Sequence, residues 1–309
     1  MLISVEKAVE LLNNGQVVAV PTETVYGLAG SLSKPQAIDK VFALKGRPAK
    51  NPLIIHIHDI EQLRQYAAEY PPDFDKLIEH FWPGPLTVVL KINESTISSK
   101  ARAGLPTAAF RMPKSKMALN LIKKTGPLVM PSANLSGRPS STKPEHVEQD
   151  FGTDFPVLDG GSSVLGLEST ILIFTENRWT IIRQGAISRE QLEKILGYRP
   201  AISDEKREDP LCPGQMFRHY APKANIVLDH AIMNWKGVVV GFSNRKYLLA
   251  TKVYSLGQSS DPSQAAENLY AVLRQLDLDG IANAHIDDDF PETGLWATIR
   301  ERLLKASRK

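Results

Sequence analysis

The sequence contains one cysteine, Cys212, and no long hydrophobic run. A single cysteine excludes a disulfide within the chain and a zinc site built from several cysteines. No apolar segment approaches the roughly 18 residues that a membrane-spanning helix needs. Near the start of the chain, Glu6, Lys7 and Glu10 interrupt the apolar residues, which is not typical of a signal peptide. These absences predict a soluble protein of the reducing cytoplasm, without contact with a membrane.

The common sequence motifs of nucleotide-binding and hydrolytic enzymes are absent as well. The chain has no G-x-x-x-x-G-K-[ST], G-x-G-x-x-G, G-x-S-x-G, H-E-x-x-H or C-x-x-C. Its seven histidines are scattered along the sequence. We therefore expect no metal site that is held by protein side chains.

Acidic residues are nearly absent from one stretch of the chain. Residues 91–143 contain ten Lys or Arg but a single acid, Glu94, although the whole chain has 37 basic and 34 acidic residues. A solvated basic face would explain this stretch, but acids are usually interspersed on such a face. The imbalance therefore favours a surface or cleft that meets phosphate groups.

Apolar segments with strand and helix periodicity follow one another along the first 200 residues. Strands are expected over 17–21, 53–57, 85–92, 107–113 and 126–131, with further strands within 155–185. Helices are expected near the N-terminus and over 35–45, 59–70, 115–124 and 188–196. Because strands and helices do not alternate strictly, we predict an α/β (α+β) fold with an open, twisted, mixed sheet and packed helices.

A change in composition follows this first unit. Residues 201–223 are rich in proline and charge and lack apolar periodicity, which indicates a linker. From residue 224 onward, strand and helix patterns alternate, as in a small Rossmann-like parallel α/β domain. We predict a main domain over 1–200, a linker over 201–223 and a C-terminal domain over 224–309.

Four polar clusters lie at the ends of predicted strands, which is where open α/β sheets bind their ligands. They are PTETVYGL (21–28), KGRPAKNPLIIHI (45–57), VMPSANLSGRPSST (129–142), and GLEST (166–170) followed by RQG (183–185). Each cluster taken alone is more easily explained by turn and cap residues. Glu168 is better explained as an anchor for backbone or for a cation than as a catalytic acid.

The cations of these clusters favour a functional interpretation. Lys45, Arg47, Arg111 and Arg183 all lie next to strand ends, where a buried cation without an anion is costly. Arginine binds carboxylate and phosphate oxygens in a bidentate way, whereas lysine acts as a compact charge. The sequence therefore predicts a polyanionic ligand.

The clusters also carry a family resemblance. Six segments closely resemble the YrdC-like family of threonylcarbamoyl-AMP synthases: PTETVYGL, K-G-R with N-P-L, WPGPLT, R-M-P, PSAN with S-G-R-P-S, and GLEST. The K-x-R and S-x-N signature pairs correspond here to Lys45 with Arg47 and Ser132 with Asn134. This resemblance spans about residues 3–200.

The rest of the chain resembles the two-domain form of the same family. R-H-Y-A-P at 218–222 is similar to the family linker, and GLWATIRERLLKAS is similar to the last helix of the extra domain. The linker departs from the family pattern because Gln215 is inserted before Met216 and Phe217 replaces a tyrosine. A role that depends on the phenol of that tyrosine is therefore not implied for Phe217.

The resemblance implies a nucleotidyltransferase with a YrdC-like catalytic domain. The implied reaction condenses L-threonine, bicarbonate or carbon dioxide, and ATP into L-threonylcarbamoyl-AMP and pyrophosphate. Mg²⁺ is implied as an ion bound with ATP, without a tightly held organic cofactor. The implied downstream partner is a threonylcarbamoyl transferase complex, which moves the group to the adenosine beside the anticodon of tRNA.

The resemblance also implies a role for each matching residue. Lys45 and Arg47 are implied as catalytic residues that, with Asn51, hold the ATP phosphates. The implied threonine site comprises Thr22, Thr24, His56, Thr107, Arg111, Met130 and Ser169. The implied ATP site further comprises Ser132, Asn134, Ser140, Arg183, His219 and Tyr220. A linker that returns over the cleft would place His219 and Tyr220 on the nucleotide as a lid.

Two other functions stay open at this point. The basic stretch 91–143 fits an RNA-binding module of the same fold without adenylate-forming activity, or a weak RNA contact of a synthase. Phe110 is its only aromatic residue and offers no stacking platform for single strands. The second alternative is an enzyme for another carboxylated amine, or an inactive family member. The retained signature pairs argue against loss of activity.

Overall fold

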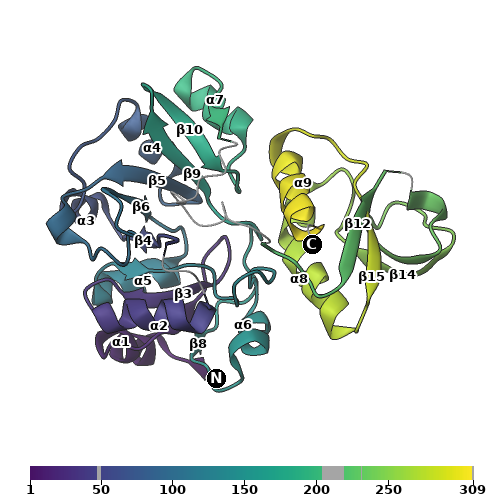
Figure 1. The fold of residues 1–309 in the computed structure, drawn as a ribbon, viewed down its shortest axis with the longest axis horizontal. Coiled ribbons are helices and arrows are strands. Elements are labelled where there is room, and N and C mark those ends of the chain that lie inside the picture. Colours follow the sequence, from purple (N-terminus) through teal and green to yellow (C-terminus); the bar gives the residue numbers. More distant parts are fainter. Residues whose placement is uncertain (47–49, 204–218, 231, 308–309) are drawn as a thin grey trace.

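The computed structural model describes residues 1–46, 50–203, 219–230 and 232–307. These residues form two β-sheets, each with its own helices (Figure 1). The elements of the larger unit are β1 (Leu2–Ile3), α1 (Val5–Asn13), β2 (Val18–Val20), β3 (Gly27–Ser31), α2 (Pro35–Lys45), β4 (Ile54–His56), α3 (Ile60–Arg64), α4 (Phe74–Phe81), β5 (Leu86–Lys91), η1 (Glu94–Thr96), β6 (Thr107–Arg111), α5 (Lys116–Thr125), β7 (Leu128–Val129), α6 (Pro144–Phe151), β8 (Val157–Leu158), β9 (Thr170–Thr175), β10 (Arg178–Arg183), α7 (Arg189–Leu196) and β11 (Ala201–Ile202). The elements that follow are β12 (Asn225–Asp229), η2 (Ile232–Asn234), β13 (Gly237–Gly241), β14 (Ala250–Ser255), α8 (Pro262–Leu278), β15 (Asn283–Asp287) and α9 (Gly294–Ser307). We call residues 1–203 the N-terminal part and residues 224–307 the C-terminal part.

The sheet of the N-terminal part has the strand order β1-β8-β2-β3-β7-β4-β6-β5-β9-β10-β11. Parallel and antiparallel neighbours are mixed: β4 and β6 are parallel, whereas β5 and β6 are antiparallel. Helices cover both faces of this sheet. Successive side chains of β2 point to opposite faces and pack against different helices. Val18 and Val20 pack in one core with α1 and α5, whereas Ala19 packs in the other with α2. The predicted open mixed sheet with packed helices is confirmed.

Strand β3, of sequence GLAGS, was not predicted because it has no β-branched or aromatic residue. Its glycines are required by close packing. A β-carbon at Gly27 would lie 3.0 Å from the β-carbon of Met130, and one at Gly30 would lie 3.1 Å from a methyl group of Val41. Small residues therefore let β3 approach both β7 and α2.

Three further differences from the sequence analysis concern the N-terminal part. Helices α4 and α6 were not predicted, and the helix predicted over 59–70 ends at Arg64. Beyond that helix, Ala67 pairs with Ile92 in an isolated antiparallel bridge, so tertiary pairing replaces the expected helical turns. At the start of the predicted linker, Ala201 and Ile202 form β11, which pairs with β10. The linker residues 204–218 lie outside the described residues.

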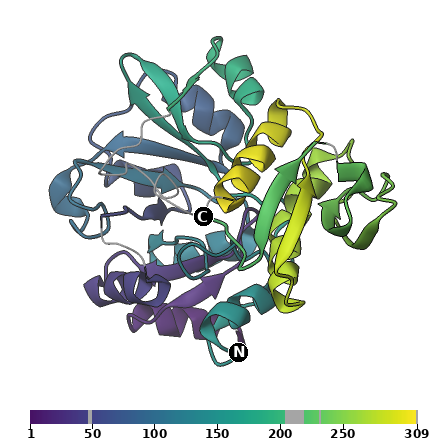
Figure 2. The same cartoon turned by 45° about the vertical axis from the view of Figure 1, so that its right-hand side comes forward.

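The sheet of the C-terminal part is entirely parallel, with the order β12-β15-β13-β14. All of its predicted strands and both helices are present. Figures 1 and 2 show α8 and α9 between this sheet and the N-terminal part. In the part of the chain that the structure describes, no helix is both long and apolar enough to cross a membrane.

The two parts share a hydrophobic cluster. Val25 and Leu167 of the N-terminal part pack among apolar residues of α8, α9 and the smaller sheet. Next to Leu167, Gly166 has a φ of +65°, and a β-carbon there would collide with the backbone of Ala266 in α8. The backbone of the GLEST loop therefore packs directly against the backbone of α8.

Candidate functional site

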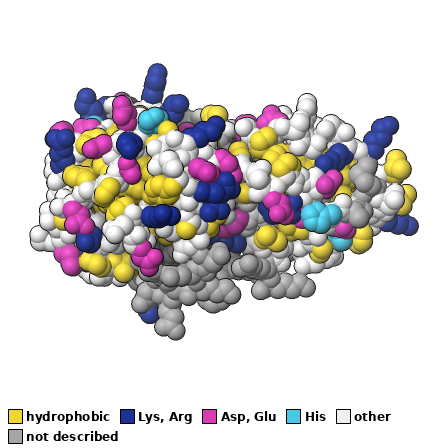
Figure 3. Space-filling model, turned by 90° about the horizontal axis from the view of Figure 1, so that it is seen from above, with side chains coloured by type: hydrophobic (Ala, Val, Ile, Leu, Met, Phe, Trp, Pro, Cys, Tyr) yellow, Lys and Arg dark blue, Asp and Glu magenta, His cyan; other side chains and the backbone are white. Residues whose placement is uncertain are grey.

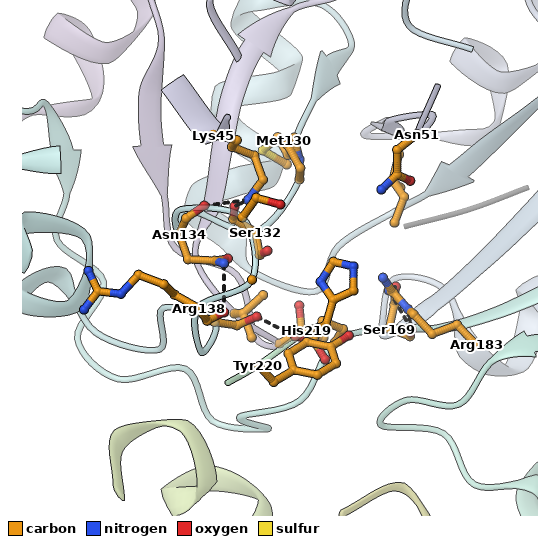
Figure 4. Close-up of a pocket in the computed structure, with 18 of the residues that line it drawn as sticks. Lys45, Asn51, Met130, Ser132, Asn134, Arg138, Ser169, Arg183, His219 and Tyr220 are labelled. Carbon is orange, nitrogen blue, oxygen red and sulfur yellow. Dashed lines mark hydrogen bonds between the residues drawn. The ribbon is translucent and has the colours of Figure 1, made fainter. Parts of the chain in front are cut away.

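Residues of the polar clusters, which lie at the ends of strands of the large sheet, line one pocket (Figure 4). Parallel strands β4 and β6 end side by side, which brings His56 next to Arg111. The loop after β7 and the start of β9 supply further walls. The predicted site residues that line this pocket are Thr24, Lys45, Asn51, His56, Arg111, Met130, Ser132, Asn134, Ser140, Ser169, Arg183, His219 and Tyr220.

Lys45 joins two clusters that are far apart in the sequence. It is the last residue of α2, and its side chain is buried. Its Nζ donates hydrogen bonds to the backbone oxygens of Ser132 at 2.5 Å and Asn134 at 2.7 Å. The Asn134 amide in turn donates to the backbone oxygens of Leu135 and Arg138, which folds the S-G-R-P turn. The cation thus lies against the wall formed by PSAN.

Arg111 is held by the PTET cluster. Its Nη1 donates to Thr24 Oγ1 at 2.9 Å, and its Nη2 forms an ion pair with Glu23 Oε1 at 2.5 Å. Thr22 does not line this pocket, but its hydroxyl lies 2.8 Å from that of Thr24. Glu23 was not predicted as part of the site. The sequence did offer a signal for Glu23: it is the acid within PTET, and a buried arginine such as Arg111 needs a nearby anion.

On the other side of the pocket, Arg183 closes over the GLEST loop. Its Nη2 donates to the backbone oxygen of Ser169 at 2.8 Å and to the Ser169 hydroxyl at 2.9 Å. The Ser169 hydroxyl also lies 2.7 Å from Thr87 Oγ1. Antiparallel pairing of β9 and β10 explains this contact, since Ser169 directly precedes β9 and Arg183 ends β10.

Glu168 is the one acid among the described residues that line the pocket. It accepts hydrogen bonds from Ser140, Tyr270 and Arg302. Burial alone would raise the pKa of Glu168, but the charges of Arg302 and Arg183 and the bond from Ser140 outweigh it and lower the pKa to about 2. The prediction of Glu168 as an anchor for a cation is confirmed.

Cations outnumber acids among the described residues that line the pocket, and two of these cations, Arg111 and Arg138, pair with Glu23 and Asp150. The pocket cations are Lys45, Arg111, Arg138 and Arg183. Burial, together with the charge of Arg111, lowers the pKa of His56 well below its ordinary value, so this imidazole is neutral at pH 7. Its Nδ1 lies 3.3 Å from the backbone oxygen of Ile54, which favours the tautomer that carries the proton on Nδ1.

Of the described residues that were predicted for the site, Thr22 and Thr107 do not line the pocket. Arg47 lies outside the described residues. Thr107 is the first residue of β6 and Arg111 the fifth, so they lie about 13 Å apart at the usual rise of a strand. The expectation that Thr107 assists Arg111 therefore requires a correction, because strand direction separates residues that are close in sequence.

The predicted basic surface over 91–143 is divided by acids, four of which come from other parts of the chain. Five of its cations form ion pairs: Lys91 with Glu69, Lys100 with Asp39, Arg102 with Glu94, Arg111 with Glu23, and Arg138 with Asp150. The face in Figure 3 likewise shows Lys and Arg interspersed with Asp and Glu. On that face, the described residues form no continuous basic track for a phosphate backbone.

Comparisons with known proteins agree with this geometry. A family model that groups the Sua5, YciO and YrdC proteins, described as telomere recombination, matches residues 10–185. A model described as the threonylcarbamoyl-AMP synthase C-terminal domain matches residues 187–308. Threonylcarbamoyl-AMP synthase from Bacillus subtilis is 37% identical over 98% of this chain and 92% of its own length. The chain belongs to the threonylcarbamoyl-AMP synthase family.

Other relatives cover the same extent. The synthase from Pyrococcus abyssi is 37% identical over 97% of this chain and 93% of its own length. The crystal structure of P. abyssi Sua5 complexed with L-threonine is 36% identical and superimposes with a TM-score of 0.90, covering 98% of this chain and 94% of that one. The predicted family, fold class and synthase function are therefore confirmed.

Proposed function

We propose that this pocket performs the synthase reaction in two steps. The amine of L-threonine first attacks carbon dioxide derived from bicarbonate and forms a carbamate. A carbamate oxygen then attacks the α-phosphorus of ATP, and pyrophosphate leaves, which yields L-threonylcarbamoyl-AMP. Both nucleophiles come from the substrates, so the protein has to orient them and stabilise charge on phosphoryl oxygens. The observation that carries this proposal is the pocket that the three buried cations Lys45, Arg111 and Arg183 line.

The threonine site is proposed at the Arg111 side of the pocket. Arg111, held by Thr24 and Glu23, would bind the threonine carboxylate, and Thr22 would support Thr24. The neutral His56 and the hydroxyl of Ser169 would bind polar groups of the amino acid, and the backbone at Met130 would complete the wall. A related structure with bound L-threonine supports this substrate.

ATP is proposed to bind between Lys45 and Arg183. Lys45 and Arg47, with Asn51, would hold the phosphates, and Lys45 would stabilise charge as pyrophosphate leaves. Ser132, Asn134 and Ser140 would contact the nucleoside through hydroxyl and amide groups, and His219 and Tyr220 would cover it. The last two residues line the same pocket, which supports the proposed lid.

Mg²⁺ is proposed to enter with ATP. No group of three or more His, Cys, Asp or Glu in the described ranges is placed to hold a metal ion. The pocket acid Glu168 already accepts hydrogen bonds on both carboxylate oxygens. This donor set fits an ion that is bound mainly by phosphates and water.

The domain organisation, the cellular location and the next enzyme complex are proposed as well. We propose a catalytic domain over 1–200, a linker over 201–223 and a C-terminal domain over 224–309, acting in the cytoplasm. The labile adenylate would pass to a transferase complex that modifies tRNA. A weak RNA contact of this chain would then serve delivery of the product.

One incubation tests the proposed function. Purified protein, ATP, threonine and bicarbonate should yield a compound with the mass of threonylcarbamoyl-AMP, together with pyrophosphate. Omission of threonine or bicarbonate should abolish both products. Pyrophosphate release that does not depend on threonine would contradict the proposal, and salt-dependent RNA binding without any ATP consumption would favour the RNA-binding module.

A further inference from the structure

A buried polar cluster joins the C-terminal part to the pocket at Glu168. Its Oε1 accepts a hydrogen bond from the Ser140 hydroxyl at 2.6 Å, and its Oε2 accepts one from Arg302 Nε at 3.0 Å. The hydroxyl of Tyr270 lies 3.0 and 2.9 Å from these two oxygens. Tyr270 belongs to α8 and Arg302 to α9. Two of the three side chains that hold this pocket carboxylate therefore come from the C-terminal part.

The same two residues hold Tyr220 in the pocket wall. The ring of Tyr220 stacks on that of Tyr270 with centroids 5.5 Å apart, and the guanidinium carbon of Arg302 lies 4.8 Å from its centroid. Tyr220 has a φ of 67°, a left-handed conformation that a non-glycine residue keeps only when its surroundings enforce it. The position of Tyr220 therefore depends on α8 and α9.

A further residue of α8, Arg274, holds the turn that precedes Ser140 in the pocket wall. Arg274, one helical turn after Tyr270, donates to the backbone oxygen of Pro139 at 2.6 Å and pairs with Asp150 at 2.8 Å. Pro139 directly precedes Ser140, the pocket residue that donates to Glu168. Residues of one helix thus hold both the Ser140 turn and the Glu168 loop.

The charge of Glu168 gives this arrangement a consequence for an anionic ligand. A carboxylate that lines a triphosphate pocket repels the ligand unless a cation offsets its charge. Arg302 supplies that charge from a fully buried position, and it also pairs with Glu301, which has a second cation in Lys305. Burial of Arg302 costs desolvation free energy that apolar side chains at the same place would not cost. Packing alone therefore does not explain why a charged pair lies here.

We propose that Arg302 and Tyr270 are positioning residues for nucleotide binding, which neutralise and fix Glu168 so that Ser140 and Tyr220 keep the ATP side of the pocket in shape. This inference rests on the proposed function in that the ligand is ATP. It assigns the C-terminal part a direct effect on the affinity of the pocket for nucleotide.

The test compares nucleotide binding in single and double variants of the full chain. Calorimetry with the non-hydrolysable analogue adenosine 5′-(β,γ-imido)triphosphate and Mg²⁺ measures binding without turnover. Arg302→Met should weaken this binding by about tenfold or more, because it leaves a buried carboxylate unpaired. The double variant Glu168→Gln/Arg302→Met should bind close to wild type, because the amide that replaces the carboxylate is uncharged but still accepts from Ser140. The KM for threonine should change by less than about twofold in both, since Arg302 acts on the ATP side.

Two further variants separate positioning from general stability. Tyr270→Phe keeps the ring that stacks on Tyr220 and removes only the hydroxyl at Glu168, so it should weaken analogue binding in a protein that still folds. Arg300→Met is the matched control on α9, because Arg300 pairs with Asp288 within the C-terminal part. It should cost stability but leave analogue binding unchanged.

Two results would overturn the inference. One is wild-type analogue binding by both Arg302→Met and Tyr270→Phe; the other is a double variant as weak as Arg302→Met, which indicates a purely structural role. If wild type binds the analogue but forms no adenylate, the proposed function fails while the double-variant comparison still decides the positioning role. If wild type binds no nucleotide, both proposals fail.

Discussion

The ammonium group of Lys45 lies 2.7 Å from the backbone oxygen of Asn134, a residue 89 positions later in the chain. This contact joins Lys45, the first residue of K-x-R, to the S-x-N pair in one wall of the pocket. A single lysine thus both supplies positive charge and holds the loop that we assign to the nucleotide. Removal of the Lys45 side chain should therefore lower the catalytic rate more than removal of any neighbouring lysine side chain.

We expect Lys45→Ala to lower the rate of threonine-dependent pyrophosphate release by about 100-fold or more, the scale for loss of one positioned charge stabiliser. Lys40→Ala is the matched control on α2. Its ammonium group donates to the Gly15 backbone oxygen at 3.0 Å, and Lys40 does not line the pocket. Near-normal turnover in Lys45→Ala, or an equal loss in both variants, would refute the assignment.

Thr24→Val tests the threonine side of the pocket. Valine keeps the shape of the side chain but removes the acceptor for Arg111 Nη1, which leaves a buried donor unpaired. We expect the KM for threonine to rise about tenfold, in line with a loss of about 1–3 kcal/mol, while the KM for ATP stays near normal. Thr107→Val makes the same change at the far end of β6 and should leave both KM values unchanged. The assignment fails if the two variants behave alike.

Gly166→Ala tests how closely the GLEST loop must approach α8. Gly104 also has a positive φ, +77°, but a β-carbon there would meet no atom within 4 Å. Gly104→Ala should therefore cost only the backbone strain of about 1–2 kcal/mol. Gly166→Ala adds a collision with the backbone of Ala266 and should destabilise the protein by a further amount of about 1 kcal/mol or more, as in an overpacked core. Equal costs in urea unfolding would show that the loop can move away.

Protonation of His146 should make stability depend on pH. Its Nδ1 accepts from the backbone amide of Thr142, and burial, with the charge of Arg274, lowers its pKa to about 3. The unfolded chain gains a proton below its ordinary pKa of about 6.5 while the folded chain does not, so the unfolding free energy falls as pH falls from 6.5 toward 3. The contribution approaches about 1.4 kcal/mol per pH unit in that window.

The difference between wild type and a His146 variant in urea unfolding between pH 6.5 and 5 isolates this effect, because Asp and Glu mostly titrate lower and the other histidines contribute equally to both proteins. His146→Asn keeps an acceptor for Thr142 but does not titrate. We expect the variant to lose about 1 kcal/mol per pH unit of the wild-type slope in this window. An unchanged slope would mean that His146 is protonated in the folded protein.

The sequence predicted those parts of the fold that leave a local pattern. Helix α2 was predicted over its observed residues 35–45, and α9 coincides with the segment GLWATIRERLLKAS. Strands rich in Val and Ile, such as β5 and β9, were predicted within a few residues. Strand β3 was not, because its glycines reflect what packs against them and not the conformation of an isolated segment.

The sequence predicted most of the residues that line the pocket, but not which side chains hold those residues in place. Cations next to strand ends indicated an anionic ligand, and most of the site residues that the family resemblance implied do line one pocket. The partners of those residues had no local signal. Nothing around Tyr270 or Arg302 distinguishes them from other residues of amphipathic helices, and their contacts with Glu168 span 102 and 134 residues.

The ion pair between Glu168 and Arg302 also constrains the order of events during protein synthesis. Domains generally fold from the N-terminus as they leave the ribosome, and contacts of large sequence separation form late. The large sheet can therefore assemble while Glu168 still lacks its cation. A nascent chain that has not yet exposed α9 would carry the pocket side chains without the ion-pair partner of Glu168. Full affinity for ATP would then arise only after the second sheet and its helices have been translated.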